Sequence, residues 1–137
     1  MANSANEHLV REFFAAMGPT LEDFKRNYAE RMTEDVVWES VGRPIHLGRD
    51  QCIGHLDDLH ARTGMEYCTI EILNLACDGD VVLSERVDTM FRADGTEIMS
   101  FRLAGAIEVR DGRIARYTDY LDTAPLLKGT EQDGHDD

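Results

Sequence analysis

The first third of the chain carries apolar residues at helical spacing. Between residues 9 and 17 they recur three and four positions apart, and Gly18-Pro19 ends this segment. A second helix is expected after Thr20, whose hydroxyl suits an N-cap, and a third from residue 48 to about 62. Residues 35–40 form a short extended piece between these two helices.

The second half of the chain changes to a period of two, which is typical of strands. Three turn signals rich in Asp and Gly separate the alternating segments. The four expected strands are residues 67–76, 81–91, 98–110 and 113–121. Three helices followed by a four-strand meander predict an α+β fold. We expect a cone-shaped, curved antiparallel sheet, covered by the three N-terminal helices, that encloses one pocket.

The length of 137 residues suits one domain with a real core. We expect a single cone-fold domain over residues 1–127 and an acidic, mobile tail over residues 128–137. The 27 acidic residues outnumber the 14 basic ones, giving a net charge of −13. Such a charge disfavours nucleic acid and anionic membrane surfaces as partners, and it favours a neutral or apolar ligand.

Neither a membrane span nor a secretory signal is apparent in the sequence. No apolar run approaches the roughly 18 residues that a span requires, and the N-terminus has no basic start followed by an apolar stretch. Cys52, Cys68 and Cys77 form no Cys-x-x-Cys pair, which favours reduced thiols. These features predict a cytoplasmic protein.

Candidate chemistry lies on two of the expected strands. Alternation places Arg86 and Asp88 on the same face as Ser84, and Asp119 lies on the last strand. If all three charged groups point inward, the arginine can bridge both carboxylates through its planar fork, which offsets the cost of burial. One carboxylate of such a trio can act as a base and the other as an acid.

A plainer interpretation of the same pattern is a solvent-facing strand. Charged residues that alternate on a strand usually face water, and cross-strand Arg–Asp pairs are common on protein surfaces. Alternation alone does not tell which face is buried.

The motifs around these residues resemble the limonene epoxide hydrolase family. The resemblance is carried by Glu85-Arg-Val-Asp88 together with Thr118-Asp-Tyr-Leu-Asp122. Gly105 precedes Asp119 by fourteen residues, and Gly112-Arg-Ile114 marks the last turn, as in that family. The similarity extends from about the second helix to Leu126.

This resemblance implies a catalytic domain with the cone fold of the nuclear transport factor, ketosteroid isomerase and SnoaL-like superfamily. It implies a homodimer without metal or organic cofactor, acting on a small apolar epoxide of the terpene or cycloalkene type. Water would be added in one step to give a vicinal diol. By position in the motif, Asp119 would be the base, Asp88 the acid and Arg86 the bridge between them.

The chain departs from the family pattern where a Tyr and an Asn help to hold the water. Trp38 and Ser40 occupy those places and are the candidate water-positioning residues, although an indole offers one N–H donor only. Six apolar residues are candidates for substrate-binding walls, with plain core packing as the alternative for each: Ile53, Leu56, Met90, Phe101, Leu103 and Leu121.

Two other functions remain open on the same fold. An isomerase, cyclase or dehydratase would use Asp88 or Asp119 to shuttle a proton on a ketone or polyketide. A non-catalytic binder of small ligands is the second alternative, since fold does not determine function. A metal site is not expected, because His46, His55 and His60 lack the spacing of metal ligands.

Overall fold

The computed structural model describes residues 2–124, which form three helices and one six-stranded sheet. The helices are α1 (Ala2–Ala15), α2 (Leu21–Arg31) and α3 (Arg49–Thr63). The strands are β1 (Met32–Ser40), β2 (His46–Leu47), β3 (Met65–Asp78), β4 (Val81–Arg92), β5 (Glu97–Arg110) and β6 (Arg113–Leu121). The predicted α+β class is confirmed, and each predicted strand of the second half is present, with ends that agree to within two residues.

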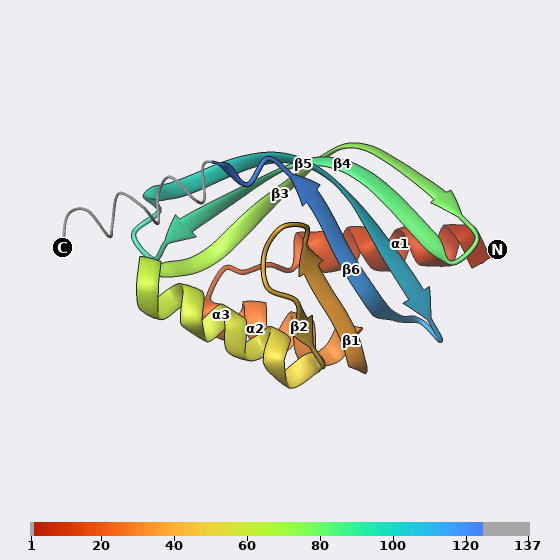
Figure 1. The fold of residues 1–137 in the computed structure, drawn as a ribbon, viewed down its shortest axis with the longest axis horizontal. Helices are drawn as coiled ribbons and strands as arrows, with labels where there is room; N and C mark the ends of the chain where they lie inside the picture. Colours follow the sequence, from red (N-terminus) through yellow and green to blue (C-terminus); the bar gives the residue numbers. More distant parts are fainter. Residues whose placement is uncertain (1, 125–137) are drawn as a thin grey trace.

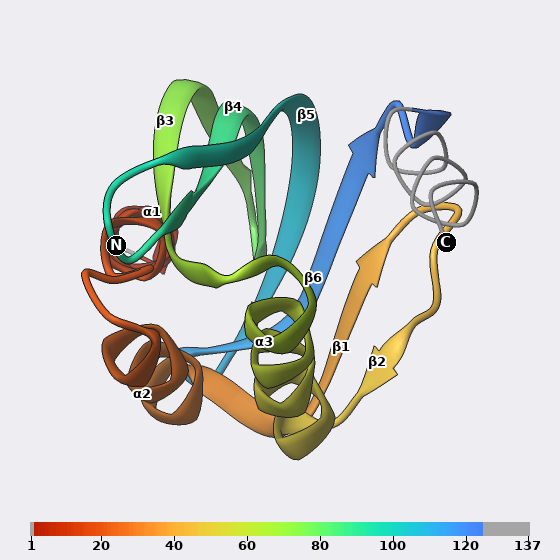
Figure 2. The same ribbon diagram turned by 90° about the vertical axis from the view of Figure 1, so that its left-hand side faces the viewer.

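The sheet has the order β2-β1-β6-β5-β4-β3. It arches over the helices, with α1 beneath the long strands and α2 and α3 across the open side (Figures 1 and 2). The predicted four-strand antiparallel meander is present as β3 to β6, and the sheet extends beyond it: β1 pairs in parallel with β6, and β2 adds to the outer edge of β1. Local alternation carries no signal for a pairing between segments about 80 residues apart, such as Ser40 with Asp119.

Local chemistry accounts for the helix ends. The hydroxyl of Thr20 accepts a hydrogen bond from the backbone N–H of Asp23 at 3.1 Å, which confirms the predicted N-cap of α2. Gly64 ends α3 in the left-handed conformation, with φ at 80°. Met32 follows the last residue of α2 as the first residue of β1 and is fully buried.

The core lies between the helices and the concave face of the sheet. Phe13 of α1 stacks on Tyr28 of α2 and meets the edge of Tyr117 on β6, with ring centroids 5.5 and 5.4 Å apart. In β4 the side chains of Val82, Ser84 and Arg86 are buried and point to this core. The inner face of β4 is therefore the face that carries the charged residues, and the solvent-facing interpretation of Arg86 is wrong.

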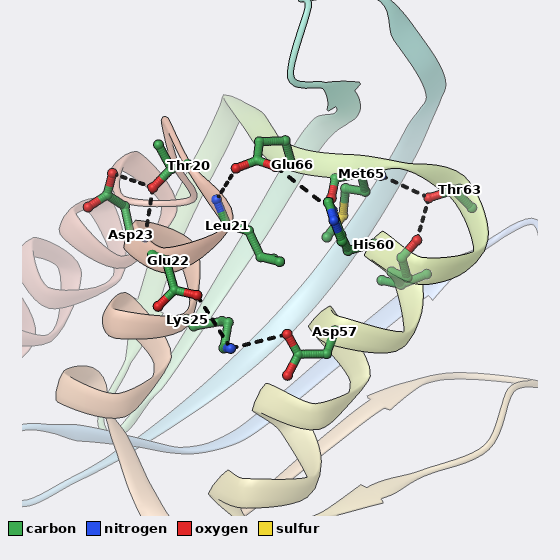
Figure 3. A network of polar contacts seen from close by, with 11 residues as sticks. Thr20, Leu21, Glu22, Asp23, Lys25, Asp57, His60, Thr63, Met65 and Glu66 are labelled. Carbon is green, nitrogen blue, oxygen red and sulfur yellow. Dashed lines mark hydrogen bonds and ion pairs between the residues drawn. The ribbon is translucent and has the colours of Figure 1, made fainter.

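A network of polar contacts fastens α2 and α3 to each other and to the start of β3 (Figure 3). Lys25 of α2 lies 3.1 Å from the carboxylate of Asp57 on α3. Glu66 of β3 accepts a hydrogen bond from the backbone N–H of Leu21, and His60 Nδ1 lies 2.8 Å from the carbonyl oxygen of Met65. These contacts fix the two helices that close the open side of the sheet.

None of the helices within residues 2–124 has the length and apolar character required to cross a membrane. The predicted acidic tail, residues 128–137, and the proposed domain end at residue 127 lie outside the described residues.

Candidate active site

Arg86 lies at the centre of the candidate site, with its side chain fully enclosed. Its Nε and Nη2 donate to the two carboxylate oxygens of Asp88 at 3.1 and 2.9 Å, and Nη2 also donates to Oδ1 of Asp119 at 2.9 Å. Nη1 donates to the hydroxyl of Ser84 at 2.9 Å. The structure thus brings together the three predicted residues, with one guanidinium bridging two carboxylates from β4 and β6.

The guanidinium group of Arg86 also lies against aromatic rings. Its carbon Cζ lies 4.4 Å from the ring centroid of Phe14 on α1 and 6.0 Å from that of Tyr117. Burial works against the charge of Arg86, but the acidic groups around it, Tyr117, Asp88 and Asp119, raise its pKa above the ordinary value. The guanidinium therefore stays protonated and holds both acids in a fixed geometry.

The two carboxylates have different surroundings. Asp88 uses both oxygens in its contact with Arg86, whereas Asp119 uses Oδ1 alone. The Oδ2 atom of Asp119 takes no part in the contact with Arg86, and the hydroxyl of Tyr117 lies close enough to this carboxyl group to lower its pKa. The side chain of Asp119 is 9% exposed and that of Asp88 is 15% exposed. Asp119 consequently keeps one oxygen outside the ion pair with Arg86.

Burial raises the pKa of Asp119 to about 6. The positive charge of Arg86 opposes this effect, and the negative charge of Asp88 adds to it. An ionised carboxylate with such a pKa is a stronger base than an ordinary aspartate and is suited to proton transfer near neutral pH.

Gly105 on β5 leaves the space into which these groups fit. It is paired in register with Ser84 on one side and with Asp119 on the other. A Cβ atom at this position would lie 2.4 Å from Oδ1 of Asp119 and 2.7 Å from Nη1 of Arg86. The backbone of Gly105 does not adopt a positive φ, so this glycine provides space at the ion pair and is not required by a turn.

A cavity of about 170 Å³ opens next to the carboxylates, and both Asp88 and Asp119 line it. Five of the six predicted wall residues are in its lining: Leu56, Met90, Phe101, Leu103 and Leu121. Ile53 is not in the lining. It packs against the hydrophobic core. Of the two interpretations given for Ile53, core packing agrees with this position, and a contact with substrate stays a prediction.

Trp38 and Ser40 both line this cavity, and Ser40 is paired in register with Asp119 across β1 and β6. The ring of Trp38 stacks on Tyr117, with centroids 5.6 Å apart and planes at 7°. Its indole nitrogen is buried and has no hydrogen-bond partner within residues 2–124. Of the two candidates for holding water, Ser40 is therefore the better placed, and Trp38 contributes an aromatic wall.

Sequence reasoning did not identify several groups of the site. Ser84 is the third hydrogen-bond partner of Arg86. Its position on the same face of the strand as Arg86 is the feature of the sequence that could have indicated this contact. His55 lines the cavity from α3, and its spacing to the other histidines gives no signal for this position. Residues of the connection between α1 and α2 and of α2 itself also line the cavity, and no local pattern indicates this: Met17, Phe24 and Tyr28.

Comparison with known proteins gives matches of two kinds. The family model of the limonene-1,2-epoxide hydrolase catalytic domain matches residues 4–132. Epoxide hydrolase EphG of Mycobacterium tuberculosis (strain ATCC 25618 / H37Rv) is 33% identical over 96 residues, which cover 70% of this chain and 61% of that protein. The chain thus matches less than two thirds of the length of this relative.

Solved structures agree with the fold. An LEH-like epoxide hydrolase of M. tuberculosis superposes with a TM-score of 0.74 at 25% identity, covering 93% of this chain and 85% of the other. A SnoaL-like polyketide cyclase from Jannaschia sp. CCS1 has the same TM-score at 15% identity, with coverages of 93% and 92%, and this likeness concerns the fold alone. With the family model matching nearly the whole chain, the protein belongs to the limonene-1,2-epoxide hydrolase family.

Proposed function

We propose that this protein is an enzyme that hydrolyses small, largely apolar epoxides of the terpene or cycloalkene type to vicinal diols in one step. The observation that carries the proposal is a fully buried arginine between two carboxylates that both line an apolar cavity. The family membership of the chain supports the same reaction. The cavity is smaller than the roughly 300–1,000 Å³ common for drug-sized ligands, which favours compact substrates.

In the proposed step, Oδ2 of Asp119 removes a proton from a water molecule while the water oxygen attacks an epoxide carbon. The carbon–oxygen bond of the ring breaks, and the ring oxygen takes a proton from Asp88. Arg86 holds both carboxylates, and Ser40 helps to place the water. Because water and the two carboxylates supply the nucleophile and the protons, the reaction needs no metal or organic cofactor.

The test is an assay of purified protein with limonene oxide, cyclohexene oxide and styrene oxide, with diol formation followed by chromatography. A reaction in oxygen-18 water should place the label in the diol during a single turnover with enzyme in excess, because no enzyme oxygen is transferred. Label-free diol under these conditions would indicate an ester intermediate on the protein. Absence of diol from all three epoxides would refute the proposed substrate class.

The value of kcat/KM should fall as the pH rises through about 6. The proposed step requires a proton on the carboxylate pair, and Asp119, whose pKa is raised by burial to about 6, loses its proton in this range. An apolar substrate displaces water from the cavity, so the alkaline limb of kcat should lie at higher pH than that of kcat/KM. Initial rates measured from pH 4 to 9 give the alkaline limb of kcat and that of kcat/KM. A kcat/KM that rises through pH 6 to a plateau would show that Asp119 acts as a lone base without a proton on its partner.

An isomerase or cyclase is the second candidate, and the raised pKa of Asp119 next to an apolar cavity is the observation that favours it. Such an enzyme would exchange a proton α to a carbonyl. Incubation of a cyclic ketone in deuterated water, followed by NMR spectroscopy, separates the two activities. An isomerase would accelerate the exchange of deuterium into the ketone, whereas an epoxide hydrolase would leave this exchange at the uncatalysed rate.

We also propose that the protein is a cytoplasmic homodimer. The three cysteines are free thiols, as expected in a reducing compartment. The convex face of the sheet exposes Leu73, Leu83 and Tyr120, and a hollow of about 480 Å³ lies beside the last two. Light scattering should give twice the mass of the chain, and replacing Leu83 with Lys should reduce it to the monomer mass.

A further inference from the structure

His55 is a polar group of the cavity that the proposed reaction does not use. The carboxylates and Ser40 come from strands, whereas His55 comes from α3 on the helical side. Within residues 2–124 neither ring nitrogen of His55 has a hydrogen-bond or ion-pair partner. His60, five residues further along the same helix, differs in this respect, since it contacts the carbonyl oxygen of Met65 and the carboxylate of Glu66.

The ring of His55 is held by its faces and edges, which leaves its nitrogens available. It stacks on His46 of β2 with centroids 4.0 Å apart, and it meets the ring of Trp38 at 5.2 Å in an edge arrangement. Burial and then the neighbouring His46 lower the pKa of His55 to about 4. At neutral pH the side chain is therefore an uncharged imidazole with one N–H donor and one nitrogen acceptor.

A polar group in an apolar cavity is unfavourable unless a ligand or water satisfies it. Both nitrogens of His55 match an uncharged oxygen, which either donates to or accepts from an imidazole. A carboxylate or phosphate on the ligand fits less well, because His55 is uncharged and the two aspartates line the same cavity.

We propose that His55 binds a hydroxyl group that the substrate carries outside its epoxide ring. This inference rests on the proposed function and narrows its substrate class to hydroxylated, otherwise apolar epoxides. His55 is then a specificity-determining residue, and the two ends of the substrate are recognised by different layers of the fold: the epoxide by the strands and the hydroxyl by α3.

The test compares two epoxides of equal size, 4-(hydroxymethyl)cyclohexene oxide and 4-ethylcyclohexene oxide. The wild-type protein should favour the hydroxymethyl compound in kcat/KM by roughly tenfold or more, since sites that hydrogen-bond a hydroxyl discriminate against analogues lacking it. His55→Phe keeps a ring for stacking on His46 and should lower kcat/KM for the hydroxymethyl compound by a larger factor than for the ethyl compound, so that the preference is lost. His60→Phe, the matched control on the same helix, should retain the preference, and His55→Gln should restore part of it.

A binding measurement keeps the inference testable without turnover. Trp38 is the chain's single tryptophan and lies next to His55, so its fluorescence reports on the cavity. Cyclohexylmethanol, which has no epoxide, should bind roughly tenfold more weakly to His55→Phe than to wild type. Equal affinities, or an equal loss of kcat/KM for both epoxides in His55→Phe, would overturn the role of His55. If neither epoxide is hydrolysed but the difference in affinity is present, the proposed hydrolysis fails and the binding role stands.

Discussion

Replacing Asp119 with Asn should reduce epoxide hydrolysis by about 10³-fold while leaving the fold intact, since a general base contributes roughly 10²–10⁴-fold. The amide keeps the size of the side chain and an oxygen that can accept from Arg86, but it cannot take a proton from water. Steady-state diol formation measures the effect. Asp78→Asn, an exposed change at the end of β3, is the matched control and should retain full activity.

The thermal stability of Asp119→Asn distinguishes the loss of the catalytic base from a loss of the fold. The pKa of Asp119 is raised in the folded protein, so this residue favours folding below about pH 4 and that contribution is lost as the pH rises through about 6. The amide of the variant does not ionise, so the variant does not lose stability through this residue as the pH rises. Thermal unfolding at pH 8 should therefore show the variant to be no less stable than the wild type.

Azide distinguishes the role of Asp119 from that of Asp88, because this nucleophile has no proton to lose. Azide should restore turnover of Asp119→Asn, with an azidoalcohol as the product. The nitrogen–carbon bond forms, the carbon–oxygen bond breaks, and Asp88 still protonates the ring oxygen. Asp88→Asn lacks that acid and should stay slow with water and with azide. Rescue of Asp88→Asn instead would assign the base to Asp88 and the acid to Asp119.

The meander and the three helices could be predicted from the sequence because their signals are local. The alternation from Val81 onwards, the Asp-Gly turns and the Thr20 cap each depend on residues close together in the chain. The parallel pairing of β1 with β6 is not local, and this pairing places Ser40 beside Asp119. The sequence could therefore indicate the residues of the site more readily than their full geometry.

Alternation along β4 could not predict which of its two faces is buried. The structure answers this question through partners that are distant in the chain: Phe14 of α1 covers the guanidinium of Arg86, and Asp119 reaches it from β6. The aspartate and arginine motif was informative because of its likeness to a family, and burial was needed to give it a chemical meaning. His55 is the opposite case, because no sequence motif includes it. Its position in the cavity follows only from how α3 packs.

Replacing Gly105 with Ala should lower kcat/KM by about 100-fold, although Gly105 has no side chain to contact the substrate. The added Cβ would lie 2.4 Å from Oδ1 of Asp119, and it also lies 3.0 Å from the carbonyl oxygen of Thr118. The carboxylate is fixed by Arg86 and cannot turn away without losing that contact, so it must shift on the order of 1 Å from its productive position. Overpacking of this kind should also cost about 1–3 kcal/mol of unfolding free energy.

The matched control is Gly54→Ala, the same chemical change in the middle of α3, where an added Cβ meets no atom within 4 Å. That variant should keep its activity and gain about 0.5–1 kcal/mol of stability, because alanine is the better helix residue. A purely structural role of Gly105 would lower stability and leave the pH profile of the remaining activity unchanged. Displacement of Asp119 from Arg86 weakens the charge that opposes its protonation, so the alkaline limb of kcat/KM should move to higher pH in Gly105→Ala. An unshifted limb together with wild-type kcat/KM would show that the strand yields elsewhere and that Gly105 does not position the ion pair.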